Sequence, residues 1–322
     1  MDRATCERLD LEALEPGVLH RLRVGLIQDG AGSTLSVPVI VKRSATPGPV
    51  VGITAAIHGN ELNGIPVIHR IARSQQVAEL RRGTVVLVPI LNVPGYLRNQ
   101  REFHDGVDLN RIMPGRPQGT SAQIYAHELM ERVVSCFEYL IDLHTASFGR
   151  ANAFYVRADM TAPVTAHMAR LARPQIIVNN TGGDGTLRSA AAARGIHAIT
   201  VEVGDPQRFQ HGLIRNSRLG IVEVLEHLGM VPDIEDPDAA ETVECKRSYW
   251  TYTDAGGLLD VSPQVCDRVK QGDPVAELCD VWGDVKVVYR APEDGIIIGK
   301  STNPVAHTGS RIVHVGVVGA AG

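Results

Sequence analysis

The sequence predicts an α/β layer domain with a mostly parallel sheet, followed by a small segment made only of strands. Two observations lead to this expectation. As far as about residue 230, short β-branched and apolar runs alternate with segments of helical spacing, an order typical of a parallel sheet covered by helices. Beyond an acidic, proline-containing stretch the helical spacing stops, and Gly and Pro divide the chain into short strands.

The elements of the first part follow one another in a regular order. The β-branched and apolar runs predict strands over 37–41, 50–57, 84–90, 139–143, 175–178 and 198–203. The spacing of apolar residues predicts helices over 64–76, 124–136, 162–171, 187–194 and 218–228. A long loop rich in Asn, Pro, Gly and Arg lies at 92–118, and a loop of that length is a mild hint of function.

The stretch 232–244 is acidic, contains two prolines and shows little periodicity, so we interpret it as a linker. This divides the 322 residues into a first domain, 1–235, and a β-rich C-terminal domain, 236–322.

Composition excludes several classes of function. Hydrophobic residues make up 44% of the chain and charged residues 21%, values ordinary for a soluble globular protein. A net charge of −4 without a block of Lys or Arg argues against nucleic acid or a membrane surface as the partner. No apolar run approaches the roughly 18 residues of a membrane helix, and the polar N-terminus does not resemble a signal peptide. Five cysteines without C-x-x-C spacing indicate reduced thiols and favour the cytoplasm.

The first candidate metal ligands are in His58-Gly-Asn-Glu61, directly after the strand 50–57. A His and a Glu three residues apart at a strand end can direct both side chains at one point. Zinc accepts both ligand types, and catalytic zinc commonly takes three protein ligands and leaves one position for water. The H-x-x-E pattern alone is common by chance.

A third ligand is offered by Ile141-Asp-Leu-His144, where another apolar strand ends. Functional groups of open α/β sheets gather at the carboxyl ends of parallel strands, so we expect His144 to meet His58 there. Asp142 shares the strand face of His144 and can orient it. The alternative is a core histidine bonded to the backbone.

The long loop carries Asp108-Leu-Asn110-Arg111, with Arg98 and Arg101 nearby. An Asn–Arg pair can hold a carboxylate, since the guanidinium donates two parallel hydrogen bonds and the amide a third. A further arginine can stabilise the charge that develops on a carbonyl oxygen. The alternative is a solvated polar loop.

Glu202 lies near the end of the apolar strand 198–203. A buried glutamate is costly unless it is paired or functional. Beside a metal-bound water it can act as general base and then as proton donor. The alternative is a salt bridge to an arginine.

In this order, the motifs H-G-N-E, D-G-V-D-L-N-R, D-L-H-T and V-E-V-G resemble those of the succinylglutamate desuccinylase/aspartoacylase family, which is related to the zinc carboxypeptidases. The resemblance runs from about Val50 to Gly229 and includes Gly185-Thr-Leu-Arg188. It implies a zinc carboxypeptidase-like three-layer domain with a mixed, mostly parallel sheet. It also implies a zinc-dependent amidohydrolase that removes an acyl group from a small N-acylated amino acid or related amine.

The resemblance further implies roles for the residues that match the motifs. One zinc ion per chain would be held by His58, Glu61 and His144, and the base would be Glu202. The residues implied in handling the substrate are Arg101 as carbonyl polariser with Arg98 as its rival, Asn110 and Arg111 at the α-carboxylate beside Asp108, and Arg188 at a distal group.

The C-terminal part, with V-K-Q-G-D-P-V ahead of A-P-E-D-G-I-I, resembles the barrel-sandwich shape of biotinyl and lipoyl carriers. Such carriers modify a lysine on an exposed turn, whereas Lys286 sits in the Val-rich run Val285-Lys-Val-Val288. We therefore expect a structural or substrate-capping domain.

Several alternatives stay open. A zinc carboxypeptidase acting on short peptides would use the same ligands, and a non-catalytic binding protein would keep only the fold. The sequence does not select the acyl group, the amine or the oligomeric state, a homo-oligomer included. Other divalent ions also suit a His/His/Glu site.

Overall fold

The computed structural model describes residues 5–183, 185–233 and 241–320, and within them the strands form two sheets. The large sheet contains β1 (Thr5–Cys6), β2 (Leu19–Gln28), β3 (Thr34–Arg43), β4 (Val50–Ala55), β5 (Thr84–Val88), β6 (Tyr139–His144), β7 (Arg150–Asn152), β8 (Phe154–Ala158), β9 (Ile176–Asn179), β10 (His197–Val203), β11 (Val243–Tyr252), β13 (Arg268–Val269), β16 (Gly295–Ser301) and β18 (Arg311–Val318). The small antiparallel sheet contains β12 (Gly257–Val261), β14 (Pro274–Cys279), β15 (Val285–Arg290) and β17 (Val305–Ala306).

The centre of the large sheet is parallel, and its flanks contain both parallel and antiparallel pairs. The strand order is β1-β2-β3-β5-β4-β6-β10-β8-β9-β11-β18-β16-β13, with β7 paired to β16. The run β5-β4-β6-β10 is parallel. The neighbouring pairs β3·β5 and β10·β8 are antiparallel. The predicted fold class, a mixed α/β domain with a small C-terminal β part, is confirmed.

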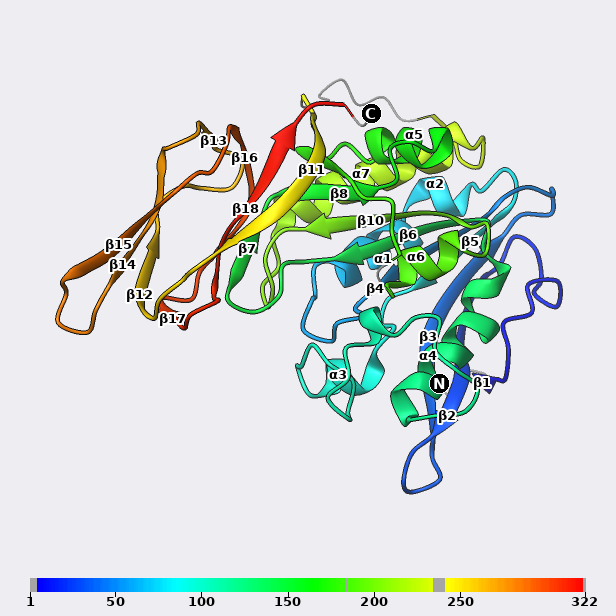
Figure 1. Cartoon of the computed structure of the whole chain (residues 1–322). Helices are drawn as coiled ribbons and strands as arrows, with labels where there is room; N and C mark the ends of the chain where they lie inside the picture. Colours follow the sequence, from blue (N-terminus) through cyan, green and yellow to red (C-terminus); the bar gives the residue numbers. More distant parts are fainter. Residues whose placement is uncertain (1–4, 184, 234–240, 321–322) are drawn as a thin grey trace.

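Helices cover both faces of this sheet (Figure 1). On one face lie α1 (Gly64–Ala72), α2 (Gln75–Ala78), α5 (Pro163–Leu171) and α7 (His211–His227). On the other lie α4 (Ser121–Arg132) and α6 (Leu187–Ala192). Alternate strand residues serve the two layers: Ile141 packs with the first and Leu140 with the second. The short helices α3 (Val93–Leu97), η1 (Leu109–Arg111) and η2 (Val134–Cys136) lie in the connections.

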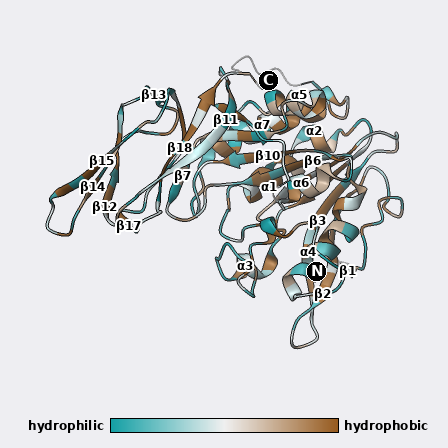
Figure 2. Cartoon of the chain, viewed as in Figure 1, coloured by the Kyte–Doolittle hydropathy of each residue, from teal (hydrophilic) through white to brown (hydrophobic). Residues whose placement is uncertain are grey.

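Hydropathy follows these layers. Brown, hydrophobic colour runs along β3 in the large sheet and along the β14–β15 hairpin (Figure 2).

Within the described ranges, no helix combines the length and the apolar character that crossing a membrane requires. The five cysteines are all free of disulfides.

The C-terminal segment continues the large sheet rather than standing apart from it. β11 pairs in parallel with β9 and antiparallel with β18, and the two C-terminal strands lie side by side in yellow and red (Figure 1). The strand β11 begins at Val243, so the linker is shorter than the predicted 232–244. The predicted boundary between residues 235 and 236 lies outside the described residues, and the division into two domains stays a prediction.

Candidate active site

The site lies where the central parallel strands end. His144 is the last residue of β6, and its register partner on the neighbouring strand β10 is Glu202. His58 follows β4 after a turn in which Ala56 adopts a left-handed conformation, with φ at 52°. Because β4 also pairs in parallel with β6, both histidines and Glu202 come from one edge of the sheet.

His58, Glu61 and His144 form a compact buried cluster. Each offers one ligand atom, and these atoms all lie within 4.8 Å of one another. Nδ1 of His58 lies 2.9 Å from Oε1 of Glu61, and Nδ1 of His144 lies 3.0 Å from Oε2. The three side chains are only 2–4% exposed. The structure thus brings together the three residues that the sequence suggested as metal ligands.

A carboxylate stands behind each histidine. Nε2 of His58 lies 3.1 Å from Asp108 Oδ1, and Nε2 of His144 lies 2.8 Å from Asp142 Oδ2. The other oxygen of Asp142 accepts a 2.7 Å hydrogen bond from the Thr54 hydroxyl. A neutral imidazole whose Nε2 donates to a carboxylate presents Nδ1 as a lone pair. Both lone pairs then point at the Glu61 carboxylate.

The charged groups of this cluster change one another's pKa values. Burial alone would raise the pKa of Glu61, but the two histidines hold it well below its usual value. Burial alone would lower the pKa of His144, yet the carboxylates of Asp142 and Glu61 raise it well above its usual value. The field around His144 therefore favours positive charge.

These donors fit a divalent cation. Nδ1 of His58 is buried and has no hydrogen-bond partner of acceptable geometry among the described residues. Three lone-pair donors that converge in a buried site repel one another unless a proton or a cation lies between them. Carboxylates that orient ligand histidines from behind are also the usual surroundings of bound zinc.

Arg101 reaches the cluster from the long loop. Its Nη1 donates to Glu61 Oε1 at 3.0 Å and to the Ser147 hydroxyl, while its Nη2 donates to Asp108 Oδ2 at 2.9 Å. Arg98 instead donates to the His104 carbonyl at the surface and does not line the cavity. Of the two rival arginines, only Arg101 is among the described residues that line the cavity.

A glycine allows this loop to approach the histidine turn. A Cβ on Gly59 would lie 2.1 Å from the carbonyl carbon of Gly95, so a larger residue could not be accommodated. Asn92 caps α3 by accepting from the Gly95 amide. Together these contacts fix the path of the chain that leads to Arg101.

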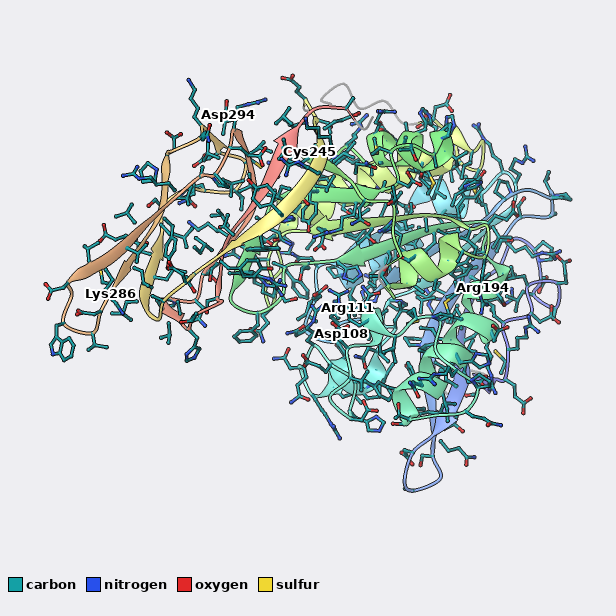
Figure 3. The ribbon with its side chains drawn as sticks, in the orientation of Figure 1. Asp108, Arg111, Arg194, Cys245, Lys286 and Asp294 are labelled. Carbon is teal, nitrogen blue, oxygen red and sulfur yellow. The ribbon has the colours of Figure 1, made fainter. Side chains whose placement is uncertain are left out.

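The D-L-N-R turn is held against the start of α6. Asn110 Oδ1 accepts a 2.7 Å hydrogen bond from the Leu187 amide, so the group it can offer a ligand is its NH2. Arg111 Nη1 donates to the Asn110 carbonyl at 2.9 Å. Asp108 and Arg111 lie close together on this turn (Figure 3). Asp108 does not line the cavity; its carboxylate lies behind His58 and against Arg101.

Arg188 lines the same cavity from α6. It is 4% exposed and donates to the carbonyl of Asn180 at 3.0 Å and to its side-chain oxygen. Its guanidinium is thus anchored in place rather than mobile.

Glu202 faces the metal cluster across the cavity. Burial raises the pKa of Glu202, although His144 and Arg157 oppose the rise. Nδ2 of Asn152 donates to its Oε2 at 3.3 Å, and Arg157 Nε lies 3.8 Å from its Oε1. A carboxylate with a raised pKa beside a metal site can accept and release a proton near neutral pH.

The cavity has a volume of about 140 Å³ and contains lining residues that the sequence did not single out. These are Arg150, Asn152, Tyr155 and Arg157 from β7 and β8, and Trp250 from β11. Trp250 shows that the C-terminal segment contributes to the wall of the site. By contrast, Lys286 lies far away on the β15 hairpin strand (Figure 3).

Comparison with known families decides the relationship. The sequence model of the succinylglutamate desuccinylase/aspartoacylase catalytic domain matches residues 47–228. The chain belongs to this family. The resemblance inferred from its four motifs is confirmed, and the matched range nearly coincides with the expected one.

Two relatives are similar to this chain over most of their length. The N-alpha-acetyl-L-2,4-diaminobutyric acid deacetylase of Halomonas elongata is 25% identical over 326 aligned positions, covering 96% of this chain and 94% of the relative. The succinylglutamate desuccinylase of Pseudomonas paraeruginosa is 28% identical over 282 positions, covering 81% of this chain and 78% of the relative.

Solved structures of family members share the fold. A succinylglutamate desuccinylase/aspartoacylase from Rhodobacter sphaeroides superposes with a TM-score of 0.85 at 24% identity, covering 99% of both chains. The product-bound ectoine utilization protein EutE (DoeB) from Ruegeria pomeroyi superposes with a TM-score of 0.82 at 21% identity, covering 93% of this chain and 95% of that one.

Proposed function

We propose that this protein is a zinc-dependent amidohydrolase that removes an acyl group from a small N-acylated amino acid. The observation that carries the proposal is the buried His58–Glu61–His144 cluster, within reach of Glu202 and at the bottom of an arginine-rich cavity. The named activities of the relatives, a deacetylase and a desuccinylase, agree with this chemistry.

Four residues of the site act directly on the water or the substrate in the proposed reaction. Glu202 takes a proton from the attacking water and returns it to the leaving amine. Arg101 donates hydrogen bonds to the carbonyl oxygen as negative charge develops on it. Asn110 and Arg111 hold the α-carboxylate through the amide NH2 and the guanidinium. A bound zinc ion supplies a Lewis acid and lowers the pKa of water.

Asp108 and Asp142 position these groups rather than contact the substrate. Each accepts from Nε2 of one histidine and so fixes the ring that faces the metal. Asp108 also forms an ion pair with Arg101. We therefore propose that Asp108 contributes to substrate binding indirectly, through Arg101. For Arg188 we keep the predicted contact with a distal group of the substrate. We keep the cytoplasm as the predicted location.

The small cavity favours this proposal over a carboxypeptidase. Trp250 closes one wall of a space of about 140 Å³, which suits an N-acyl amino acid better than a peptide chain. Hydrolysis of N-acyl amino acids without cleavage of hippuryl peptides is the expected pattern.

Metal content tests the proposal most directly. Elemental analysis of the purified protein should find about one zinc per chain. His144→Ala should lose the metal, whereas His167→Ala, a change at an exposed histidine far from the cluster in the sequence, should keep it. A native protein that holds no metal, and takes up none on reconstitution, would overturn the hydrolase and leave a binding role.

A further inference from the structure

The wall of the cavity beside Glu202 contains a row of residues from four paired strands. The register joins them in the order Asn152 of β7, Gly299 of β16, His314 of β18 and Trp250 of β11. Directly opposed residues of paired strands share one face of the sheet. Asn152 and Trp250 both line the cavity, so this row borders it. Three of the four strands lie in the predicted C-terminal domain.

Gly299 is the one position of this row without a side chain. A Cβ there would lie 2.5 Å from Asn152 Oδ1 and 3.0 Å from the carbonyl oxygen of Ala151. The first distance is an overlap, so a larger residue would have to displace the Asn152 side chain. A glycine within a strand often marks a place where another backbone approaches closely. Here it allows β16 to lie directly against the short strand β7.

The strand β7 depends on this neighbour. Among the described strands, β7 pairs only with β16. Just beyond β7, the Ala153 amide continues the contact by donating to the Ile298 carbonyl at 2.8 Å. Outside the ladder, the Asn152 amide donates to Asp205 Oδ1 at 3.3 Å. The position of Asn152 is therefore set mainly by a strand from the C-terminal segment.

Asn152 in turn contacts the proposed base. Its Nδ2 donates to Glu202 Oε2 at 3.3 Å, and its side chain is 9% exposed. An ionised carboxylate only accepts hydrogen bonds, so the NH2 group has to face Glu202 while Oδ1 faces Gly299. Crowding at Gly299 would turn or displace this amide and so remove the hydrogen bond to Glu202.

We propose that Gly299 is a positioning residue of the proposed active site. By leaving room for Asn152, it lets β16 hold that amide against the carboxylate of Glu202. The inference rests on the proposed function and deepens it, because it makes a C-terminal strand part of the support of the base rather than a cap over the substrate. A side chain at position 299 should therefore affect the reaction step and not the affinity for substrate.

A double-mutant cycle of Gly299→Ala and Asn152→Ala tests the contact. Each single variant should lower kcat about 10-fold, with zinc content unchanged and KM within about twofold, because the hydrogen bond to the carboxylate is lost. The double variant should be no slower than Asn152→Ala alone, since the new methyl group no longer meets an amide oxygen. Losses that multiply to about 100-fold, or an unchanged kcat in Gly299→Ala, would overturn the inference.

Gly295→Ala is the control for crowding of β16 in general. A Cβ on Gly295 would lie 2.6 Å from Val315 Cγ1 and 2.7 Å from the Gly316 carbonyl oxygen, both on β18. This variant should melt at a lower temperature but keep its kcat, and an equal loss of kcat in it would contradict the proposal. If Gly299→Ala does not fold, the double variant decides: folding with the activity of Asn152→Ala supports the contact, and failure to fold overturns it.

The side-chain amide of Asn152 gives a readout that does not depend on hydrolysis. Its NMR signal, assigned by its absence in Asn152→Ala, should shift in Glu202→Ala and in Gly299→Ala, because both lose the hydrogen bond. The signal should stay in place in Gly295→Ala. This pattern without hydrolysis of any amide would overturn the hydrolase but support the positioning contact. Hydrolysis with a signal that Gly299→Ala leaves unmoved would overturn only the positioning role.

Discussion

The two ends of the cavity differ in how their charges are satisfied. The metal end is formed by His58, Glu61 and His144. There each histidine lies between two carboxylates, and the three side chains are almost fully buried. At the arginine end, Arg111 contacts a backbone carbonyl and Arg150 contacts an aromatic ring. One end is organised by ion pairs within the protein, whereas at the other no described carboxylate forms an ion pair with Arg111 or Arg150.

This difference suits the two ends to different tasks, the metal end to the proposed reaction and the arginine end to recognition of the substrate. Ligand geometry at a catalytic metal must be held within a fraction of an ångström, and the carboxylates behind His58 and His144 provide that support. Recognition of the substrate needs groups that gain more from the ligand than from the protein, and a guanidinium that contacts only a backbone carbonyl or an aromatic ring among the described residues is such a group. Glu202 and Arg101 stand between the two ends.

Removing the base should have the largest effect. Glu202→Gln keeps the size and most hydrogen bonds of the side chain but cannot accept the proton of water. We expect kcat to fall about 100- to 10,000-fold while zinc content is unchanged. Steady-state kinetics with parallel elemental analysis measures both. A variant that retains full activity would remove Glu202 from the mechanism.

Arg101 lies between the two ends of the cavity, and its replacement should have the second largest effect on kcat. Arg101→Gln removes the donor for the developing oxyanion, and kcat should fall about 100- to 1,000-fold. Arg98→Gln is the matched control, because Arg98 lies on the same loop but outside the cavity. Equal losses in the two variants, measured as kcat on one substrate, would show that the loop rather than Arg101 matters.

The carboxylates behind the histidines give a sharper comparison. Asp142→Asn weakens the support of His144, and zinc affinity measured by competition with a chelator should fall about 10- to 100-fold. Asp108→Asn should also lower zinc affinity, but it releases Arg101 as well and so should reduce kcat of the zinc-loaded enzyme. Identical profiles of the two variants would contradict their different positions.

The sequence predicted that His58, Glu61 and His144 lie together, and the structure brings them together because they follow strongly patterned elements. The apolar strands β4, β6 and β10 are buried on both faces, and polar residues at their ends are conspicuous. Parallel pairing then brings His58, His144 and Glu202 to one edge of the sheet. Local pattern and topology suggested these residues as candidates, and the resemblance to the family favoured them over the alternatives.

The arginine end could not be predicted in this way. Arg150 lies on a three-residue strand, β7, whose partner β16 is far along the chain, with Asn152 opposite Gly299. Trp250 lies in the predicted C-terminal domain, and the pairings of β11 with β9 and of β16 with β7 join that segment to the strands of the site. Such contacts depend on long-range register, which the spacing of residues within a short segment does not encode. The sole local hint was the density of Arg and Asn between 150 and 157.

The smallest effect concerns pH. Glu202 must be deprotonated to act as base, and burial raises its pKa, so kcat/KM should fall as pH decreases through that raised value. Asn152 stabilises the charged form by donating to Oε2. Asn152→Ala should therefore raise the pKa of Glu202 further and move the acidic limb of the profile upward by about one unit. Arg157→Gln removes a positive charge beside Glu202, so its profile should shift in the same direction. A limb that stays in place in both variants would mean that a group other than Glu202 sets it.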